Sequence, residues 1–154
     1  MITINEILGN EENYTWWLTI MPDVMYNLQL LPKNVSSKLD YSVESLNILE
    51  LYIIENYNME ELKLPKYKTV DDLFSRYIGE TFRRNIKDAI WEMEKREKYY
   101  GYGYPLINKK NNIPFTKVHP SSILFGAIAN AEENGIYKTG EYLSGILKYI
   151  MSED

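Results

Sequence analysis

Residues 69–93 read TVDDLFSRYIGETFRRNIKDAIWEM, and within this stretch the spacing of the apolar side chains changes from that of a helix to that of a strand. Up to Ile86, apolar residues recur every three or four positions, which predicts an amphipathic helix. This stripe consists of Val70, Leu73, Phe74, Tyr77, Ile78 and Thr81. Farther on, Ala89, Trp91 and Met93 share one face and two glutamates the other, as in a half-buried strand. The two periods together predict a protein that contains both helices and a sheet.

Helices are expected on the N-terminal side of this stretch. A proline in the first turn predicts a short helix over residues 22–31. Ser42 predicts the N-cap of a longer helix over residues 42–57. Thr69 with Asp72 predicts an acidic variant of the capping box at the start of the next helix.

Two segments of this half have no clear period. In residues 1–21, Trp16-Trp17-Leu18 is compatible with a short strand or with the turn before a helix. The polar, proline-containing residues 60–68 predict a link between helices.

The C-terminal side adds two strands, a turn and two helices. The strands are expected at residues 100–107 and 113–118, with the turn between them at residues 108–112. The helices are expected at residues 120–135 and 142–150. The predicted fold is therefore α+β, with helices before and after a three-stranded antiparallel meander, in a single domain of residues 1–154.

The amino-acid composition excludes several kinds of catalytic and metal site. The chain has no cysteine and one histidine, which excludes a disulfide framework, thiolate catalysis and a cysteine-ligated zinc site. His119 would have to be the base of any Ser-His-Asp triad, and its place directly before Pro120 at an expected helix start argues against that role. We therefore expect no metal site and no cofactor.

Charge and hydropathy argue against nucleic acids and membranes as partners. The net charge is −5 and the two signs are mixed along the chain, so no basic surface for phosphate backbones is expected, and no nucleic acid as partner. The start lacks the features of a secretory signal, and the longest apolar stretch, around residues 123–131, is far short of a membrane span. A cytoplasmic protein with no membrane contact is expected.

Alternating tyrosine and glycine in residues 100–104 give the clearest indication of a binding surface. In an extended strand Tyr100, Tyr102 and Tyr104 would form a row of phenols on one face. Tyrosine buries a large area at low entropic cost and keeps a hydroxyl for hydrogen bonding, which suits a protein-binding surface. The same row would also suit a sheet face that the protein covers with its own helices.

Two glutamates are candidates for acid chemistry. Glu50 falls among apolar residues on one face of its helix, where burial would raise its pKa, but a tyrosine or arginine partner would make it structural. Glu80 lies four residues from both Arg76 and Arg84, which favours a ladder of surface ion pairs. As a pair flanking a cleft, the two glutamates would suit a small hydrolase or a glycan-active enzyme.

Gly79 interrupts an otherwise good helix and therefore predicts the close approach of another segment, with a binding role as the alternative. Trp91 shares its strand face with apolar neighbours, which favours packing in the core over an exposed anchor.

Two short segments carry a family resemblance. Residues 39–46, LDYSVESL, resemble an LDYS-x-x-SL segment, and Tyr77-Ile-Gly-Glu80 followed by Trp91 resembles a Y-[IL]-G-E…W segment, of small bacterial proteins of uncharacterised function. Some of these resemble immunity proteins of toxin systems. The likeness extends over residues 22–150 in the order of elements, although residues 85–88 lack a glycine that such relatives often carry. It implies helices against a small antiparallel sheet and no catalytic residues.

These observations favour a non-enzymatic cytosolic protein that binds another protein, with a toxin as the candidate partner. The alternatives are the hydrolase or glycan-active enzyme based on Glu50 and Glu80, and a structural component of a mobile-element cluster.

Overall fold

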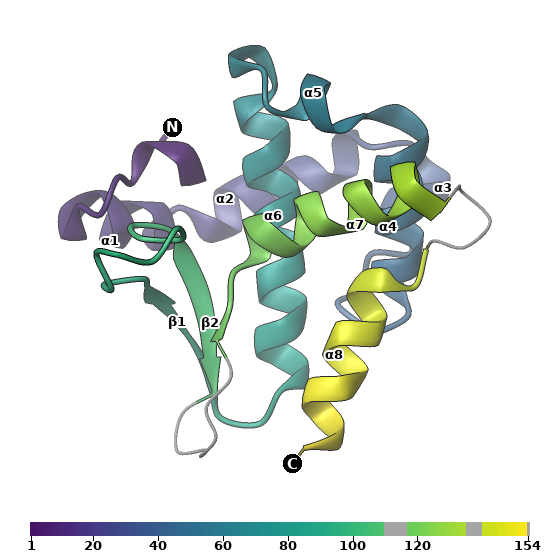
Figure 1. The fold of residues 1–154 in the computed structure, drawn as a ribbon. Coiled ribbons are helices and arrows are strands. Elements are labelled where there is room, and N and C mark those ends of the chain that lie inside the picture. Colours follow the sequence, from purple (N-terminus) through teal and green to yellow (C-terminus); the bar gives the residue numbers. More distant parts are fainter. Residues whose placement is uncertain (110–116, 135–139, 154) are drawn as a thin grey trace.

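A computed structural model describes residues 1–109, 117–134 and 140–153 of the chain. Helix α6 (Lys68–Asn85) runs through the centre of the molecule, with elements from both halves of the chain around it (Figure 1). Every residue from Phe74 to Phe82 is buried. The apolar stripe expected from the sequence is therefore only part of the contact surface of α6, because its polar face is covered as well.

The N-terminal half consists of short helices. They are 3₁₀ helix η1 (Ile4–Glu6), α1 (Glu11–Thr19), α2 (Met21–Met25), 3₁₀ helix η2 (Tyr26–Leu30), α3 (Lys33–Ser36), α4 (Ser45–Asn56), α5 (Met59–Leu62) and 3₁₀ helix η3 (Pro65–Tyr67). The segment around Trp17 is helical and is neither the short strand nor the turn that the sequence predicts. Asn10 caps this helix, α1, because its side chain accepts a hydrogen bond from the backbone N–H of Asn13 at 2.9 Å.

The other N-terminal expectations are met in part. The helix expected over residues 22–31 is divided between α2 and η2, and residues 60–68 are largely helical rather than a link. Helix α4 begins three residues after Ser42, but the Ser42 hydroxyl still accepts a hydrogen bond from the backbone N–H of Ser45 at 3.1 Å.

The C-terminal half contains the sheet and two further helices. Strands β1 (Ala89–Met93), β2 (Pro105–Lys109) and β3 (Lys117–Val118) pair antiparallel in the order β1-β2-β3, and α7 (Pro120–Asn134) and α8 (Tyr142–Ser152) follow. In this register Trp91 lies opposite Ile107, which lies opposite Val118. The predicted α+β fold, with helices before and after a three-stranded antiparallel sheet, is confirmed. Residues 110–116 and Gly135, which belong to the expected turn, third strand and helix end, lie outside the described residues.

The strand expected over residues 100–107 is wrong for residues 100–104. These residues form turns in which the backbone N–H of Tyr104 donates to the carbonyl of Gly101 at 3.0 Å, and β2 begins only at Pro105. Gly103 has a φ of +82° and lies so close to residue 9 that a Cβ would be 2.6 Å from the Gly9 nitrogen. Tyrosine and glycine alternate here because the glycines permit turns, so the three tyrosines do not form a row on one face.

The expected capping box at Thr69 and Asp72 is also wrong. Asp72 is fully buried and points to the N-terminal segment, where its Oδ1 accepts from the backbone N–H of Ile4 at 2.7 Å and from Trp17 Nε1 at 2.8 Å. Its Oδ2 binds Arg76 Nε at 2.7 Å, and Arg76 Nη1 donates to the carbonyl of Trp17 at 2.6 Å. Through these hydrogen bonds to Ile4 and Trp17, the buried ion pair of Asp72 and Arg76 connects η1 and α1 to α6.

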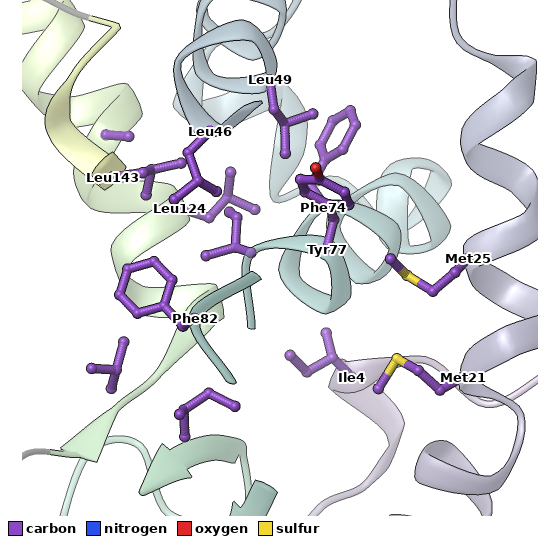
Figure 2. Close-up of a cluster of buried hydrophobic side chains, with 14 of the residues drawn as sticks. Ile4, Met21, Met25, Leu46, Leu49, Phe74, Tyr77, Phe82, Leu124 and Leu143 are labelled. Atoms are coloured by element: carbon purple, nitrogen blue, oxygen red, sulfur yellow. The ribbon is translucent and has the colours of Figure 1, made fainter. Parts of the chain in front are cut away.

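A continuous hydrophobic core surrounds α6. Figure 2 shows Phe74, Tyr77 and Phe82 of α6 among side chains from every part of the fold. The other labelled members are Ile4, Met21, Met25, Leu46, Leu49, Leu124 and Leu143. The strand face with Trp91 and Met93 packs against the same core. None of the helices in the described ranges is long and apolar enough to cross a membrane.

Candidate functional site

A cavity of about 730 Å³ opens between α5, η3, the start of α6, the turns at residues 100–104 and the start of α7. This volume is typical of ligand pockets. Its walls are Asn5, Met59, Leu62, Lys63, Leu64, Pro65, Lys68, Asp71, Tyr100, Gly101, Tyr104, His119, Ser121, Ser122 and Phe125. The cavity therefore combines an apolar floor with polar groups from four separate segments.

The three tyrosines that were predicted to bind a partner are placed differently around this cavity. Tyr100 stands at its rim, 78% exposed, and its hydroxyl donates to Ser122 Oγ at 3.3 Å. Tyr104 is half-buried in the wall and donates to Asn5 Oδ1 at 3.1 Å. Tyr102 is not among the lining residues, and its phenol lies against Gly9 instead. Two of the three tyrosines thus belong to one site.

A cluster of two buried residues, Glu94 and His119, and two exposed ones, Arg96 and Tyr99, lies next to the turns that carry Tyr100. The His119 ring stacks on the Tyr99 ring with 5.3 Å between centroids. The Arg96 guanidinium also lies over the Tyr99 ring, 4.2 Å from its centroid. Glu94 accepts from Arg96 Nη2 at 2.6 Å, and this bond lowers the pKa of Glu94 to about 2. Burial lowers the pKa of His119, whose Nε2 lies 3.2 Å from the ionised Glu94 and therefore carries the proton in the neutral ring.

Asp71 supplies the only carboxylate among the residues that line the cavity. Burial raises its pKa to about 6, against the opposing effect of hydrogen bonds from Asn5 Nδ2 at 3.2 Å and Ser75 Oγ at 3.1 Å. Lys63 and Lys68 line the same cavity, and Lys68 is paired with Glu6, whose Oε1 lies 3.7 Å from the Lys68 Nζ. Lys63 has no carboxylate partner in the described ranges, so its charge favours an anion over a cation in the cavity.

Glu50 lies away from this cavity. Its side chain is fully buried, as expected, but its partners are neither tyrosine nor arginine. Its carboxylate accepts from the backbone N–H groups of Gly140 at 2.6 Å, Tyr142 at 3.2 Å and Leu143 at 2.8 Å, at the start of α8. Glu50 is thus a helix cap from a distant part of the chain, with no surface for a substrate.

Glu80 is buried as well, rather than part of a surface ladder. It accepts from Arg83 Nε at 2.9 Å, from Arg84 Nε at 3.4 Å and from Trp91 Nε1 at 2.8 Å. Arg76, the other expected partner, pairs with Asp72 instead. Since Glu50 caps α8 and Glu80 binds Trp91, the two glutamates have separate partners and do not flank the cavity.

Gly79 allows Trp91 to reach Glu80. A Cβ at residue 79 would overlap the Trp91 indole and lie 2.9 Å from Pro120 Cγ, which confirms the predicted close approach. The Trp91 ring also packs edge-on against Trp17 with 5.1 Å between centroids, so the predicted role of Trp91 in core packing is confirmed.

The two segments of the family resemblance touch each other. Tyr41 stacks on Tyr77 at 4.9 Å between centroids and donates its backbone N–H to the Tyr77 hydroxyl at 2.9 Å. That hydroxyl also lies 2.7 Å from Ser45 Oγ, and Arg84 lies over the Tyr41 ring at 3.7 Å. The motif residues thus form a packing unit that joins α4 to α6.

Sequence reasoning did not single out Asp71, Lys63, Ser121 or Ser122. Each has an ordinary place in its own segment, and only the three-dimensional fold brings them together. The run Pro-Ser-Ser at 120–122 is the one local signal, because it marks a helix start with free N–H groups. In the described ranges there is no group of three or more histidine, aspartate or glutamate side chains that could hold a metal ion.

Comparisons of the chain with protein-family models, with curated proteins and with solved structures give no match.

Proposed function

We propose that this protein is a non-enzymatic, protein-binding module of the immunity-protein type, which acts in the bacterial cytoplasm on a toxin. The observation that carries the proposal is the position of Tyr100. Its ring is 78% exposed, yet it is positioned by a hydrogen bond to Ser122 and by its contact with Tyr99 at 5.2 Å between centroids. A large aromatic side chain that is exposed but already ordered loses little entropy on binding, as in the anchors of protein interfaces.

The surroundings of Tyr100 support the same function. A rim aromatic beside a cavity lets a partner cover the ring and insert a group into the cavity, which is how anchor residues of interfaces are desolvated. The absence of cysteine agrees with a reducing compartment, and the net charge of −5 disfavours nucleic acid as partner. An enzyme based on Glu50 and Glu80 is not proposed, because both carboxylates are buried and bonded to this chain.

Affinity capture from the native bacterium tests the proposal. Immobilised wild-type protein should retain a toxin protein, identified by mass spectrometry, that also loses its effect on growth when this protein is co-expressed. Tyr100→Ala, alone or combined with Tyr102→Ala, should weaken capture by about tenfold or more, since an anchor aromatic such as Tyr100 contributes about 2 kcal/mol.

Tyr149→Ala is the matched control, because Tyr149 is 69% exposed on α8, outside the cavity. It should leave capture unchanged. Circular dichroism must show that each variant is folded; Tyr102 packs against Gly9, so Tyr100→Ala alone decides the outcome if the double variant unfolds. Full capture by folded Tyr100→Ala would contradict the proposal.

A further inference from the structure

The start of α7 presents hydrogen-bond donors that the described part of the chain does not use. Ser121 is only 9% exposed and lines the cavity, but its hydroxyl makes no hydrogen bond to a described residue. The backbone N–H groups of Ser121 and Ser122 likewise have no acceptor among the described residues, and the first bonded N–H is that of Ile123, which donates to the His119 carbonyl at 3.1 Å. The first N–H groups of an α-helix have no acceptor within the helix, and in this helix they belong to residues that line a cavity, where a ligand can accept from them.

The electrostatic environment selects an anionic partner for these donors. Helix α7 has 15 residues, so its N-terminus carries the positive end of a helix dipole. Lys63 Nζ lies 5.9 Å from the ring centroid of Phe125, which is one turn along α7 from Ser121 and Ser122. Lys63 has no carboxylate partner in the described ranges. Asp71 opposes an anion, but its oxygens are engaged by Asn5 and Ser75.

The rest of the cavity selects an apolar group next to that anion. Met59, Leu62, Leu64 and Phe125 contribute an apolar floor. A ligand that satisfies both regions must join a carboxylate to an apolar group within a cavity of about 730 Å³. The C-terminal residue of a protein has this chemistry when its side chain is apolar.

We propose that the cavity binds the C-terminal residue of the partner protein, with its free carboxylate at the start of α7 and its apolar side chain on the floor. The carboxylate accepts from the N–H groups of Ser121 and Ser122 and from the Ser121 hydroxyl, and Lys63 compensates its charge. The inference rests on the proposed function, because it names the part of the partner that enters the site. An internal glutamate or aspartate would bring a carboxylate but leave the apolar floor uncovered.

A titration of the ¹⁵N-labelled full chain with N-acetyl-leucine tests this assignment. The amide resonances of Ser121 and Ser122 should shift and saturate in the millimolar range, as expected for so small a ligand. N-acetyl-leucinamide, which keeps the side chain but lacks the carboxylate, should bind more weakly by a factor of at least about ten. Lys63→Gln and Ser121→Ala should each weaken binding of N-acetyl-leucine several-fold, whereas Lys38→Gln, at an exposed lysine on another face, should not.

Three results would overturn the assignment. They are equal binding of the amide, shifts confined to other parts of the chain, and tighter binding of N-acetyl-glutamate α-amide, which would assign the site to an acidic side chain. Failure here is distinct from failure of the proposed function. If Tyr100→Ala loses the partner but no probe binds, only the C-terminal assignment falls; if probes bind but Tyr100→Ala retains the partner, the proposed function falls.

Discussion

Helices α8 and α7 begin in opposite ways. At the start of α8, backbone N–H groups within residues 140–143 donate to the buried carboxylate of Glu50 over 2.6 to 3.2 Å. At the start of α7, the N–H groups of Ser121 and Ser122, two residues that line a cavity, have no acceptor among the described residues. The chain thus satisfies one helix N-terminus with its own carboxylate and leaves the other accessible.

The difference indicates what each helix start is for. A carboxylate that is 90 residues away in sequence from the first N–H it binds holds α8 against α4, so the start of α8 stabilises the fold. The same kind of donor at the start of α7 is available to a ligand. Glu50 also shows, within this molecule, the geometry that a ligand carboxylate would adopt at α7.

The largest effect is expected from removing the internal carboxylate. Glu50→Ala should reduce the free energy of unfolding by about 3 kcal/mol, because it leaves buried N–H groups without an acceptor. Glu50→Gln keeps one acceptor oxygen and should cost less. Urea denaturation measures both, and Glu55→Ala, at an exposed position of the same helix, is the control that should change little. A loss under 1 kcal/mol for Glu50→Ala would mean that the α8 start is satisfied in another way.

Two helix glycines differ in the space around them: Gly79 lies against Trp91, whereas Gly145 has open space next to it. Gly79→Ala should lower stability by about 2 kcal/mol, because the new methyl group would displace Trp91 and weaken its bond to Glu80. Gly145 of α8 is exposed and a Cβ there would meet nothing within 4 Å, so Gly145→Ala should raise stability by up to about 1 kcal/mol. Thermal melts that show the same sign for both variants would contradict this packing.

Local patterns in the sequence predict most of the fold. The change of period after Ile86 locates α6 and β1, since an apolar stripe and an alternating strand each require only a few neighbouring residues. The burial of Glu50 also follows from its apolar neighbours on the helix. Its partners do not, because they are backbone groups of a helix start far along the chain, and a backbone N–H has no sequence signature.

The site is less predictable than the fold. The sequence points to the tyrosines at residues 100 and 104, but their alternation with glycine predicts a strand, whereas Gly103, at a φ of +82°, makes this segment a turn. The cavity itself joins separate segments, and its polar groups become neighbours only after the helices pack. Sequence reasoning therefore finds two wall residues and misses the donors that define what the cavity can bind.

A smaller effect, which raises stability instead of lowering it, is expected at Asp71, the one carboxylate among the residues that line the cavity. Its pKa of about 6 in the folded protein lies above the ordinary value of 3.8, so ionised Asp71 opposes folding by at most about 3 kcal/mol. Asp71→Asn removes this charge but weakens the bonds to Asn5 and Ser75. The variant should therefore be more stable at pH 7 by about 1 to 2 kcal/mol.

The pH dependence gives this prediction its sign. As pH rises from about 4 to about 6, the unfolded chain loses the Asp71 proton before the folded protein does, so the contribution of Asp71 to stability falls and then stays constant. The difference between Asp71→Asn and wild type should grow over this interval by about 2 kcal/mol, so that at pH 4 the variant, with its weaker bonds to Asn5 and Ser75, is no more stable than wild type. Urea denaturation at several pH values measures it, with Asp23→Asn on α2 as an exposed control. A difference independent of pH would show that Asp71 is not the titrating group.

The smallest effect on stability is expected from giving α7 a carboxylate of its own. Ser122→Asp places one at the third helical position, beside the free N–H groups, and an acidic side chain in a first turn contributes about 0.5 kcal/mol. The start of α7 would then resemble that of α8. Binding of N-acetyl-leucine should be lost by competition for the same donors, whereas Ser122→Asn, which adds similar volume without the charge, should retain part of it. A variant that is stabilised but still binds the probe normally would mean that the ligand carboxylate uses other donors, and the contrast between the two helix starts would then have no bearing on function.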